Sequence, residues 1–248
     1  MSNFVTIFNS NNSTNHNFME TNTMYNQNTN RYNDDLIDNP STRCPVALVL
    51  DTSGSMEGDP INELNAGIQS FLQEVKNDDL ACYSVEIAVF VADGHGGRCL
   101  QDFTCAENID GFSTMSAYGG TPLGQAVNEA LNKLENRKSQ YKKTGTPYYQ
   151  PWLVIISDGY PNDYDWEQAA DKAKNLASQR KLVSLPIGVQ GADLSALQRF
   201  SNKPAVALQG LKFREFFSWL SASMSRVSAS TSTEAAVNLP AINSWASI

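Results

Sequence analysis

The feature that most constrains the fold of this chain is an apolar run, Val46–Leu50, which passes directly into the sequence Asp-Thr-Ser-Gly-Ser at residues 51–55. The run is rich in branched residues and does not alternate with polar ones, a pattern typical of a strand buried on both faces of a parallel sheet. Open α/β sheets bind their ligands at the carboxyl edge of such strands. One carboxylate and two hydroxyls would emerge there, with Gly54 allowing a tight backbone turn.

Two later segments carry matching chemistry. The sequence Gly-Gly-Thr-Pro at residues 119–122 opens a predicted helix, and Ile-Ile-Ser-Asp-Gly at residues 155–159 ends another apolar strand. Hydroxyl and carboxylate oxygens are the ligands that small, hard cations prefer. We therefore predict an all-oxygen cation site formed by Asp51, Ser53, Ser55, Thr121 and Asp158.

These three motifs, in this order, resemble the von Willebrand factor A domain and its metal-ion-dependent adhesion site. The resemblance covers about residues 43 to 226 and includes all the positions of the predicted site. It implies a Rossmann-like, three-layer α/β sandwich. The central sheet would be mostly parallel, with one antiparallel edge strand.

Three stretches are also similar to the bacterial TerY-like proteins of tellurium- and stress-resistance clusters, namely Gly119–Gly124, Pro151–Asp163 and Phe213–Ser223. This similarity implies a bacterial stress, metal-resistance or signalling assembly. Kinase- and phosphatase-like proteins accompany the domain in such systems and are the partners that the resemblance suggests.

The family pattern also implies roles for the site residues. The hydroxyls of Ser53, Ser55 and Thr121 would contact Mg²⁺ (or Mn²⁺), Thr121 only in the ligand-bound conformation. Asp51 and Asp158 would act mainly through water molecules. A partner's Asp or Glu carboxylate would fill the open position on the ion, so the resemblance implies a metal-dependent protein-binding module and not an enzyme.

Two other functions stay open. The chain could be a scaffold with a vestigial site, in which Asp51 only caps its own turn through backbone N–H groups. It could also transfer phosphoryl groups with Asp51 as the nucleophile. Against an enzyme, position 53 is a serine where a second carboxylate would be needed, and the sequence has no Gly-rich phosphate-binding loop and no Ser/His/Asp set.

Composition narrows the partners and the compartment. The net charge of −8 disfavours a direct nucleic-acid partner. We expect a cytoplasmic protein, because no apolar run approaches the roughly 20 residues of a membrane span and no signal-peptide pattern opens the sequence.

The cysteines and histidines do not indicate a zinc site. Cys44, Cys82, Cys99 and Cys105 lack metal-ligand spacing, and the only histidines are His16 and His95. We expect reduced thiols, with a Cys99–Cys105 disulfide as the alternative, and His95 exposed in a Gly-rich turn.

We divide the chain into an Asn-rich, disordered extension at 1–41, the von Willebrand factor A domain at 42–226 and a Ser-rich tail at 227–248. The tail is predicted to be loose, and the alternative is that it covers an apolar groove or binds a partner through Trp245. Near the predicted site, four acidic residues are either tuning residues or solvated loop charges: Glu57, Asp59, Asp163 and Asp165.

Hydrophobic periodicity predicts the elements between the motifs. Strands are expected at 46–50, 83–92, 98–104 (the antiparallel edge), 151–157, 182–189 and 205–208. Helices are expected from Pro60 to Val75, from Pro122 to Leu134 or beyond, and at 166–179, 194–200 and 213–224, with a polar loop at 142–149.

Overall fold

The structure is a computed structural model that describes residues 35–189, 191–242 and 245–247. The predicted disordered extension at 1–41 therefore lies mostly outside the described residues, as does His16. Contacts divide the chain into Met1–Pro40 and Ser41–Ile248. In the first unit, residues 35–38 form one helical turn. The sheet and the helices that cover it belong to the second unit.

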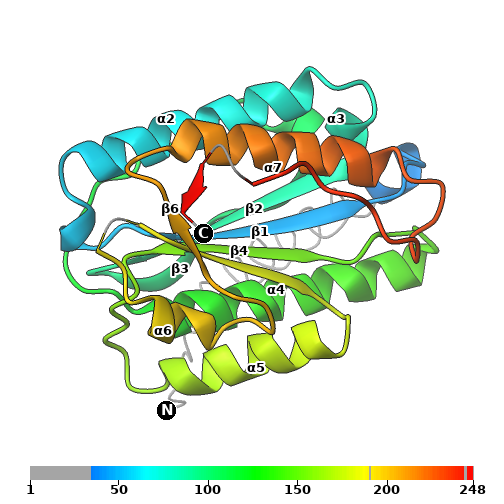
Figure 1. Cartoon of the computed structure of the whole chain (residues 1–248). Helices are drawn as coiled ribbons and strands as arrows, with labels where there is room; N and C mark the ends of the chain where they lie inside the picture. Colours follow the sequence, from blue (N-terminus) through cyan, green and yellow to red (C-terminus); the bar gives the residue numbers. More distant parts are fainter. Residues whose placement is uncertain (1–34, 190, 243–244, 248) are drawn as a thin grey trace, which may run out of the picture. The chain divides into compact units, whose positions relative to one another are not determined.

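In the described residues, seven strands form one sheet in the order β3-β2-β1-β4-β5-β6-β7 (Figure 1). Their bounds are β1 Cys44–Asp51, β2 Val85–Asp93, β3 Gly96–Cys105, β4 Trp152–Ser157, β5 Val183–Gly188, β6 Val206–Leu208 and β7 Ala246–Ser247. Strands β2, β1, β4, β5 and β6 are parallel, and β3 pairs antiparallel with β2. The predicted mostly parallel sheet with an antiparallel edge strand is confirmed.

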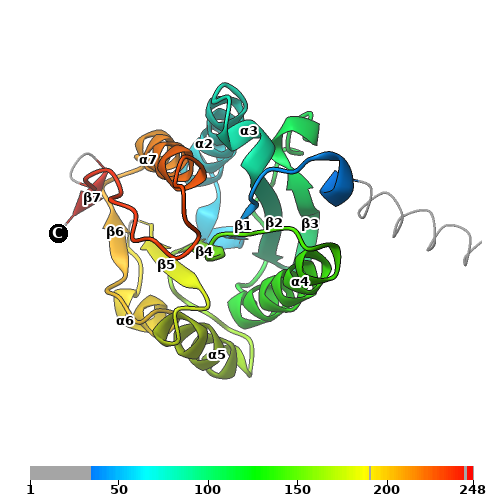
Figure 2. The same ribbon diagram turned by 90° about the vertical axis from the view of Figure 1, so that its right-hand side faces the viewer.

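Helices cover both faces of the sheet. One face carries α2 Asp59–Lys76, α3 Ala81–Ser84 and α7 Phe213–Ser228, and the other carries α4 Leu123–Thr144, α5 Trp166–Ser178 and α6 Leu194–Gln198 (Figure 2). Two short 3₁₀ turns, Gly54–Met56 and Ala106–Asn108, join elements at the ends of the strands. This is the three-layer sandwich that the sequence predicted.

Strand β1 shows why its sequence is an unbroken apolar run. Successive side chains of a strand point to opposite faces. Val46, Leu48 and Leu50 accordingly belong to the hydrophobic core under α2 and α7, whereas Ala47 and Val49 belong to the core under α4 and α5. Because helices cover both faces, every position from Val46 to Leu50 is apolar.

The end of α4 differs from the prediction. We expected a polar loop from Lys142, but α4 continues to Thr144 and ends at Gly145, whose φ of 72° is in the left-handed region. Lys142 and Lys143 occupy the last helical turn, where positive charge interacts favourably with the carbonyl end of a helix.

The C-terminal segment is not loose in the described residues. Trp245 is fully buried and lies edge-on to Phe216, with ring centroids 5.0 Å apart. The indole of Trp219 donates a hydrogen bond to the carbonyl of Pro240 over 2.9 Å. Strand β7 pairs antiparallel with β6 and adds a second antiparallel edge. The expectation of a loose tail is therefore wrong, and the segment covers the aromatic side of α7.

None of the four cysteines, all within the described residues, takes part in a disulfide, as expected for reduced thiols. Cys99 and Cys105 lie on the same strand, β3, and form no disulfide with each other. None of the helices in the described part of the chain combines the length and apolar character that crossing a membrane requires.

Candidate metal centre

The candidate centre begins at Asp51, the last residue of β1. Its carboxylate is fully buried. One oxygen, Oδ1, accepts a hydrogen bond from the Ser53 amide over 2.9 Å, and Oδ2 accepts one from the Ser157 hydroxyl over 2.5 Å. Asp51 thus caps its own turn, as the scaffold alternative requires. Each oxygen keeps further lone-pair capacity, so the cap does not exclude a cation.

Two hydroxyls stand next to this carboxylate. The Oγ atoms of Ser53 and Ser55 are 3.0 Å apart. Oxygens that bind Mg²⁺ at about 2.1 Å and at right angles to one another are about 3 Å apart, so this pair fits two adjacent corners of an octahedron. Ser53 is buried and Ser55 is exposed, which leaves the pair open to solvent on one side.

The loop that carries Thr121 is bonded to this turn. The amide of Gly54 donates to the carbonyl of Gly119 over 2.9 Å, and the amide of Tyr118 donates to the carbonyl of Thr52 over 2.8 Å. Gly119 has a φ of 69°, and a Cβ atom there would lie 2.4 Å from the Cα of Gly94. Only glycine fits this crossing of two loops, which explains the Gly-Gly pair before Thr121.

Thr121 and Asp158 are linked through a residue that the sequence did not indicate. The side-chain oxygen of Asn162 accepts from the Thr121 amide over 3.1 Å, and the Asn162 amide donates to the Thr121 carbonyl over 3.0 Å. Asp158, in the same loop as Asn162, is buried, and its carboxylate accepts from the Tyr160 amide over 3.3 Å. Asn162 therefore holds the Thr121 loop beside the Asp158 loop.

The environment of the Asp51 carboxyl is unfavourable for its charged form. Burial raises the pKa of the Asp51 carboxyl, hydrogen bonds from Ser157 and Ser53 oppose that rise, and the negative charge of Asp158 adds to it. A pair of buried carboxylates is costly without a counter-charge. A cation placed between these loops would offset that cost.

The structure thus brings the predicted residues together at one edge of the sheet. Hydrogen bonds join Ser53 to Asp51 and to Ser55. The turn that these residues form is bonded to the Thr121 loop, and the Thr121 loop is bonded to the Asp158 loop. Within the described residues, no group of three or more His, Cys, Asp or Glu side chains could hold a metal ion. A cation at this centre would therefore have to take hydroxyl oxygens among its ligands, and such a donor set fits a hard divalent cation.

Of the four acidic residues near the site, one has a defined structural role. The carboxylate of Asp163 accepts from the amides of Gly124 and Gln125, over 3.2 and 2.8 Å, and so caps the start of α4. Glu57 and Asp59 are exposed. Asp165 directly precedes α5 without a side-chain cap bond.

Ser157, like Asn162, has a role at the candidate site that the sequence did not predict. It is the last residue of β4, and its hydroxyl also accepts from the Gly159 amide over 2.9 Å. The pairing of Leu50 with Ile156 places Ser157 beside Asp51. A polar residue at the end of the strand next to the Asp51 strand was the available signal.

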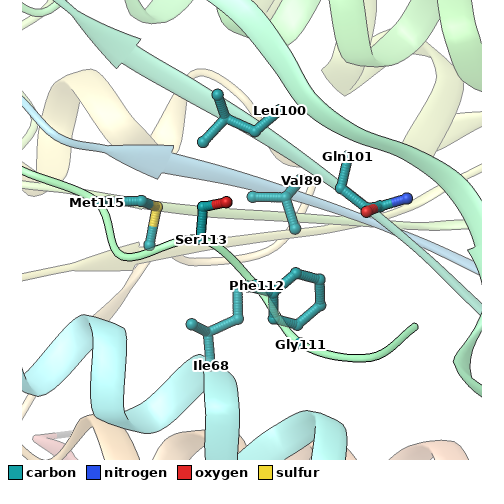
Figure 3. Close-up of a pocket in the computed structure, with 8 residues that line it drawn as sticks. All are labelled: Ile68, Val89, Leu100, Gln101, Gly111, Phe112, Ser113 and Met115. Atoms are coloured by element: carbon teal, nitrogen blue, oxygen red, sulfur yellow. The ribbon is translucent and has the colours of Figure 1, made fainter.

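A separate pocket of about 120 Å³ lies between α2, β2, β3 and the loop that follows β3 (Figure 3). Its lining combines polar and apolar surface and consists of Ile68, Val89, Leu100, Gln101, Gly111, Phe112, Ser113 and Met115. It is smaller than the roughly 300 Å³ at which ligand pockets begin. Val89 lies in the middle of β2, so this pocket is not part of the carboxyl edge.

Fold and site together define an α/β domain with a candidate cation centre at the carboxyl ends of its parallel strands. The family model of the von Willebrand factor type A domain matches residues 46–218. The chain belongs to this family. No curated protein sequence matches the chain.

Solved structures share the fold. The pilus adhesin SpaC from Lactobacillus rhamnosus GG, in an open conformation, superposes with a TM-score of 0.59 at 14% identity over 75% of this chain and 30% of that chain. The minor pilin PilB from Streptococcus sanguinis gives 0.55 at 12% identity, over 75% and 62% of the two chains. Proximal thread matrix protein 1 from the mussel byssus, with a zinc-occupied MIDAS motif, gives 0.52 at 13% identity, over 74% and 47%.

At these identities the likeness concerns the fold alone. The chain spans about a third of the adhesin and about half of the byssus protein.

Proposed function

We propose that this chain is a protein-binding module that holds Mg²⁺ (or Mn²⁺) in a metal-ion-dependent adhesion site at the carboxyl edge of its sheet. The residues of the site are Asp51, Ser53, Ser55, Thr121 and Asp158. The observation that carries the proposal is the 3.0 Å approach of the Ser53 and Ser55 hydroxyls beside two buried carboxylates.

Each residue has a role in the proposal. The hydroxyls of Ser53 and Ser55 bind the cation directly, and Thr121 joins them when a ligand is bound. Asp51 and Asp158 supply the negative charge that retains the ion and act mainly through water molecules. When bound, the cation supplies a Lewis acid that accepts a carboxylate oxygen from an Asp or Glu of the partner.

The setting is part of the same proposal. The stretches at 119–124, 151–163 and 213–223 support a TerY-like protein of a bacterial tellurium- or stress-resistance or signalling complex. Kinase- or phosphatase-like proteins would then be the partners, in the cytoplasm. The solved relatives described as a pilus adhesin and as a byssus protein with a zinc-occupied MIDAS motif support a metal-assisted binding role.

A direct test follows the backbone amides of Gly119, Thr121 and Tyr160 by NMR. An Asp-containing peptide at millimolar concentration should shift these signals in Mg²⁺ and leave them unchanged in EDTA. Thr121→Ala should weaken the peptide about tenfold or more, because it removes one hydroxyl that closes onto the ion. If Thr121→Ala leaves peptide affinity unchanged, the coupling between this loop and ligand binding is wrong.

The same experiment separates the other two functions. Peptide binding that persists in EDTA would favour a metal-independent scaffold. Turnover of a phosphate ester that Asp51→Asn abolishes would favour an enzyme. The hydrogen bonds from the Ser53 amide and the Ser157 hydroxyl stabilise the Asp51 carboxylate as an acceptor, which suits a structural ligand better than a nucleophile.

A further inference from the structure

The loops around the candidate cation site carry three exposed aromatic side chains. Tyr118 is 58% exposed, Tyr160 is 61% exposed and Tyr164 is fully exposed. In the described residues, the other exposed tyrosine is Tyr83, which lies in α3, just before the start of β2 and thus at the opposite end of the sheet. Exposed aromatic rings therefore gather at the edge where the site lies.

Two of these tyrosines, Tyr118 and Tyr160, are held by hydrogen bonds of their backbone. Tyr118 donates its amide to Thr52 and accepts from the Gly94 amide, both over 2.8 Å, and its ring stacks on the imidazole of His95 with centroids 5.3 Å apart. The amide of Tyr160 donates to the carboxylate of Asp158. Rings held in this way lose little conformational freedom on binding, and tyrosine is enriched among the residues that dominate interfaces.

The same loops are strongly acidic. Residues 51–59, 117–122 and 158–165 contain six carboxylates and no lysine or arginine. A positively charged side chain nearby, that of Arg98, is already paired with Asp93. A divalent cation would neutralise two of the six negative charges, so the edge would stay net negative. A partner segment made only of acidic residues would be repelled by it.

Three of these carboxylates are available to a partner. Asp51 and Asp158 belong to the cation site, and the oxygens of Asp163 accept from two amides of α4. Glu57 and Asp59 are exposed, and Asp165 is partly exposed. These negative charges and the electron-rich faces of the tyrosines attract the same kind of group, an ammonium or guanidinium.

We propose, resting on the proposed function, that the partner presents a single Asp or Glu flanked by Lys or Arg. The carboxylate reaches the cation, and the basic neighbours stack on Tyr118 and Tyr160 and pair with the free carboxylates. The tyrosines are then specificity-determining residues for a mixed-charge segment, distinct from the residues that hold the ion.

A peptide library with a fixed central Asp and randomised neighbours tests this directly. The full chain is immobilised in Mg²⁺, and bound peptides are eluted with EDTA. We expect Lys and Arg to be enriched on either side of the Asp. Enrichment of acidic neighbours, or no charge preference, would overturn the inference. Failure to elute any peptide with EDTA would instead contradict the proposed function on which it rests.

Single substitutions distinguish the contribution of the tyrosines to peptide binding from that of the ion. Tyr118→Ala and Tyr160→Ala should each weaken a selected basic-flanked peptide about fivefold, without changing the affinity for Mn²⁺. Tyr83→Ala is the matched control, because it removes an exposed tyrosine at the other end of the sheet and should change neither. Equal peptide affinity for the wild type and both edge variants would show that the rings do not recognise the partner.

Discussion

At the scale of single residues, a buried charge cluster surrounds Glu86, away from the candidate metal centre. Its carboxylate is fully buried and accepts from Nε and Nη2 of Arg137, both over 2.7 Å, and from the Tyr141 hydroxyl over 2.6 Å. Nε of Arg43 lies 3.3 Å away. The cluster joins the start of β2 to α4 and to the residue before β1.

Replacing Glu86 should therefore be severe. In Glu86→Gln two arginines stay buried without their counter-charge, and breaking a buried pair in this way costs about 3–5 kcal/mol. Urea unfolding of the wild type and variant measures the loss. Glu63→Gln is the matched control, because that carboxylate pairs with Arg214 at the surface over 3.8 Å, and such a pair is worth less than about 1 kcal/mol. Equal losses in the two variants would contradict this account.

The ion pair at the end of β2 predicts a pH effect. Asp93 is buried, which by itself raises the pKa of its carboxyl, but the hydrogen bond and charge of Arg98 and the His95 amide outweigh burial and lower that pKa. A lowered folded-state pKa means that the carboxylate contributes stability above its unfolded pKa of about 3.9, and that this contribution is lost as pH falls through the folded pKa.

Arg98→Gln should accordingly raise the pKa of Asp93 toward its ordinary value. It should also reduce stability at neutral pH more than at a pH below the lowered folded-state pKa of Asp93, where the carboxyl is protonated in both proteins. NMR titration of the Asp93 carboxyl carbon measures the first effect, and unfolding at the two pH values measures the second. An unchanged Asp93 pKa in the variant would show that Arg98 does not set it.

The residues of the site were predictable from the sequence to different degrees. Asp51, Ser53 and Ser55 share one turn, so their proximity follows from their spacing. Ser157 and Asn162 were not predicted, because their contacts depend on the register of β4 against β1 and on the path of a loop. Cation binding itself stays a prediction.

At the scale of elements, α2 does more than cover the sheet. The amide group of Asn65 makes two hydrogen bonds to the backbone of Met115, each over 2.8 Å, and Gln69 donates to the carbonyl of Phe112 over 2.6 Å. These bonds fix the loop that leads to Tyr118 and Thr121, so α2 positions the start of the loop that carries Thr121.

Loss of one of these side chains should loosen that loop. Asn65→Ala removes both bonds to Met115, so the Met115 amide should exchange with deuterium about tenfold faster or more, at a cost of about 1–2 kcal/mol. Asn62→Ala, an exposed position one turn earlier on α2, is the control and should leave the Met115 amide protected. If Met115 exchanges alike in the two variants, the clamp is not formed in solution.

Element boundaries were predictable where the chain carries a local stop signal. The Gly at 145 and the lysines at 142 and 143 are such a signal for the end of α4, although we expected a loop there. In contrast, nothing local marks β7, because its two residues become a strand only by pairing with β6. Short edge strands depend on tertiary contacts and not on their own sequence.

At the scale of the whole molecule, the C-terminal segment completes the core. Besides Trp245, Tyr149 reaches it by donating its hydroxyl to the carbonyl of Ser230 over 2.6 Å, and Arg226 donates to the carbonyl of Asn238 over 2.8 Å. The Ser-rich composition of the segment suggested a frayed end. The composition of the segment could not reveal that it covers the aromatic side of α7 around Phe216 and Trp219.

Trp245→Ala should therefore destabilise the domain as a core substitution does, by about 3–5 kcal/mol. Chemical denaturation measures this loss. Leu239→Ala, in the same segment but 37% exposed, should cost far less and serves as the control. A loss of less than about 1 kcal/mol for Trp245→Ala would mean that the segment is loose after all.

Titration of Mn²⁺ into the full chain tests whether the proposed cation site binds an ion. Loss of the free-ion EPR signal counts the bound ions. The wild type should bind one ion saturably, the Ser53→Ala/Ser55→Ala double variant should not, and a Ser113→Ala/Ser116→Ala control, which alters two exposed serines, should bind like the wild type. Equal Mn²⁺ binding in the wild type and the Ser53/Ser55 variant, or no binding by the wild type, would contradict the account.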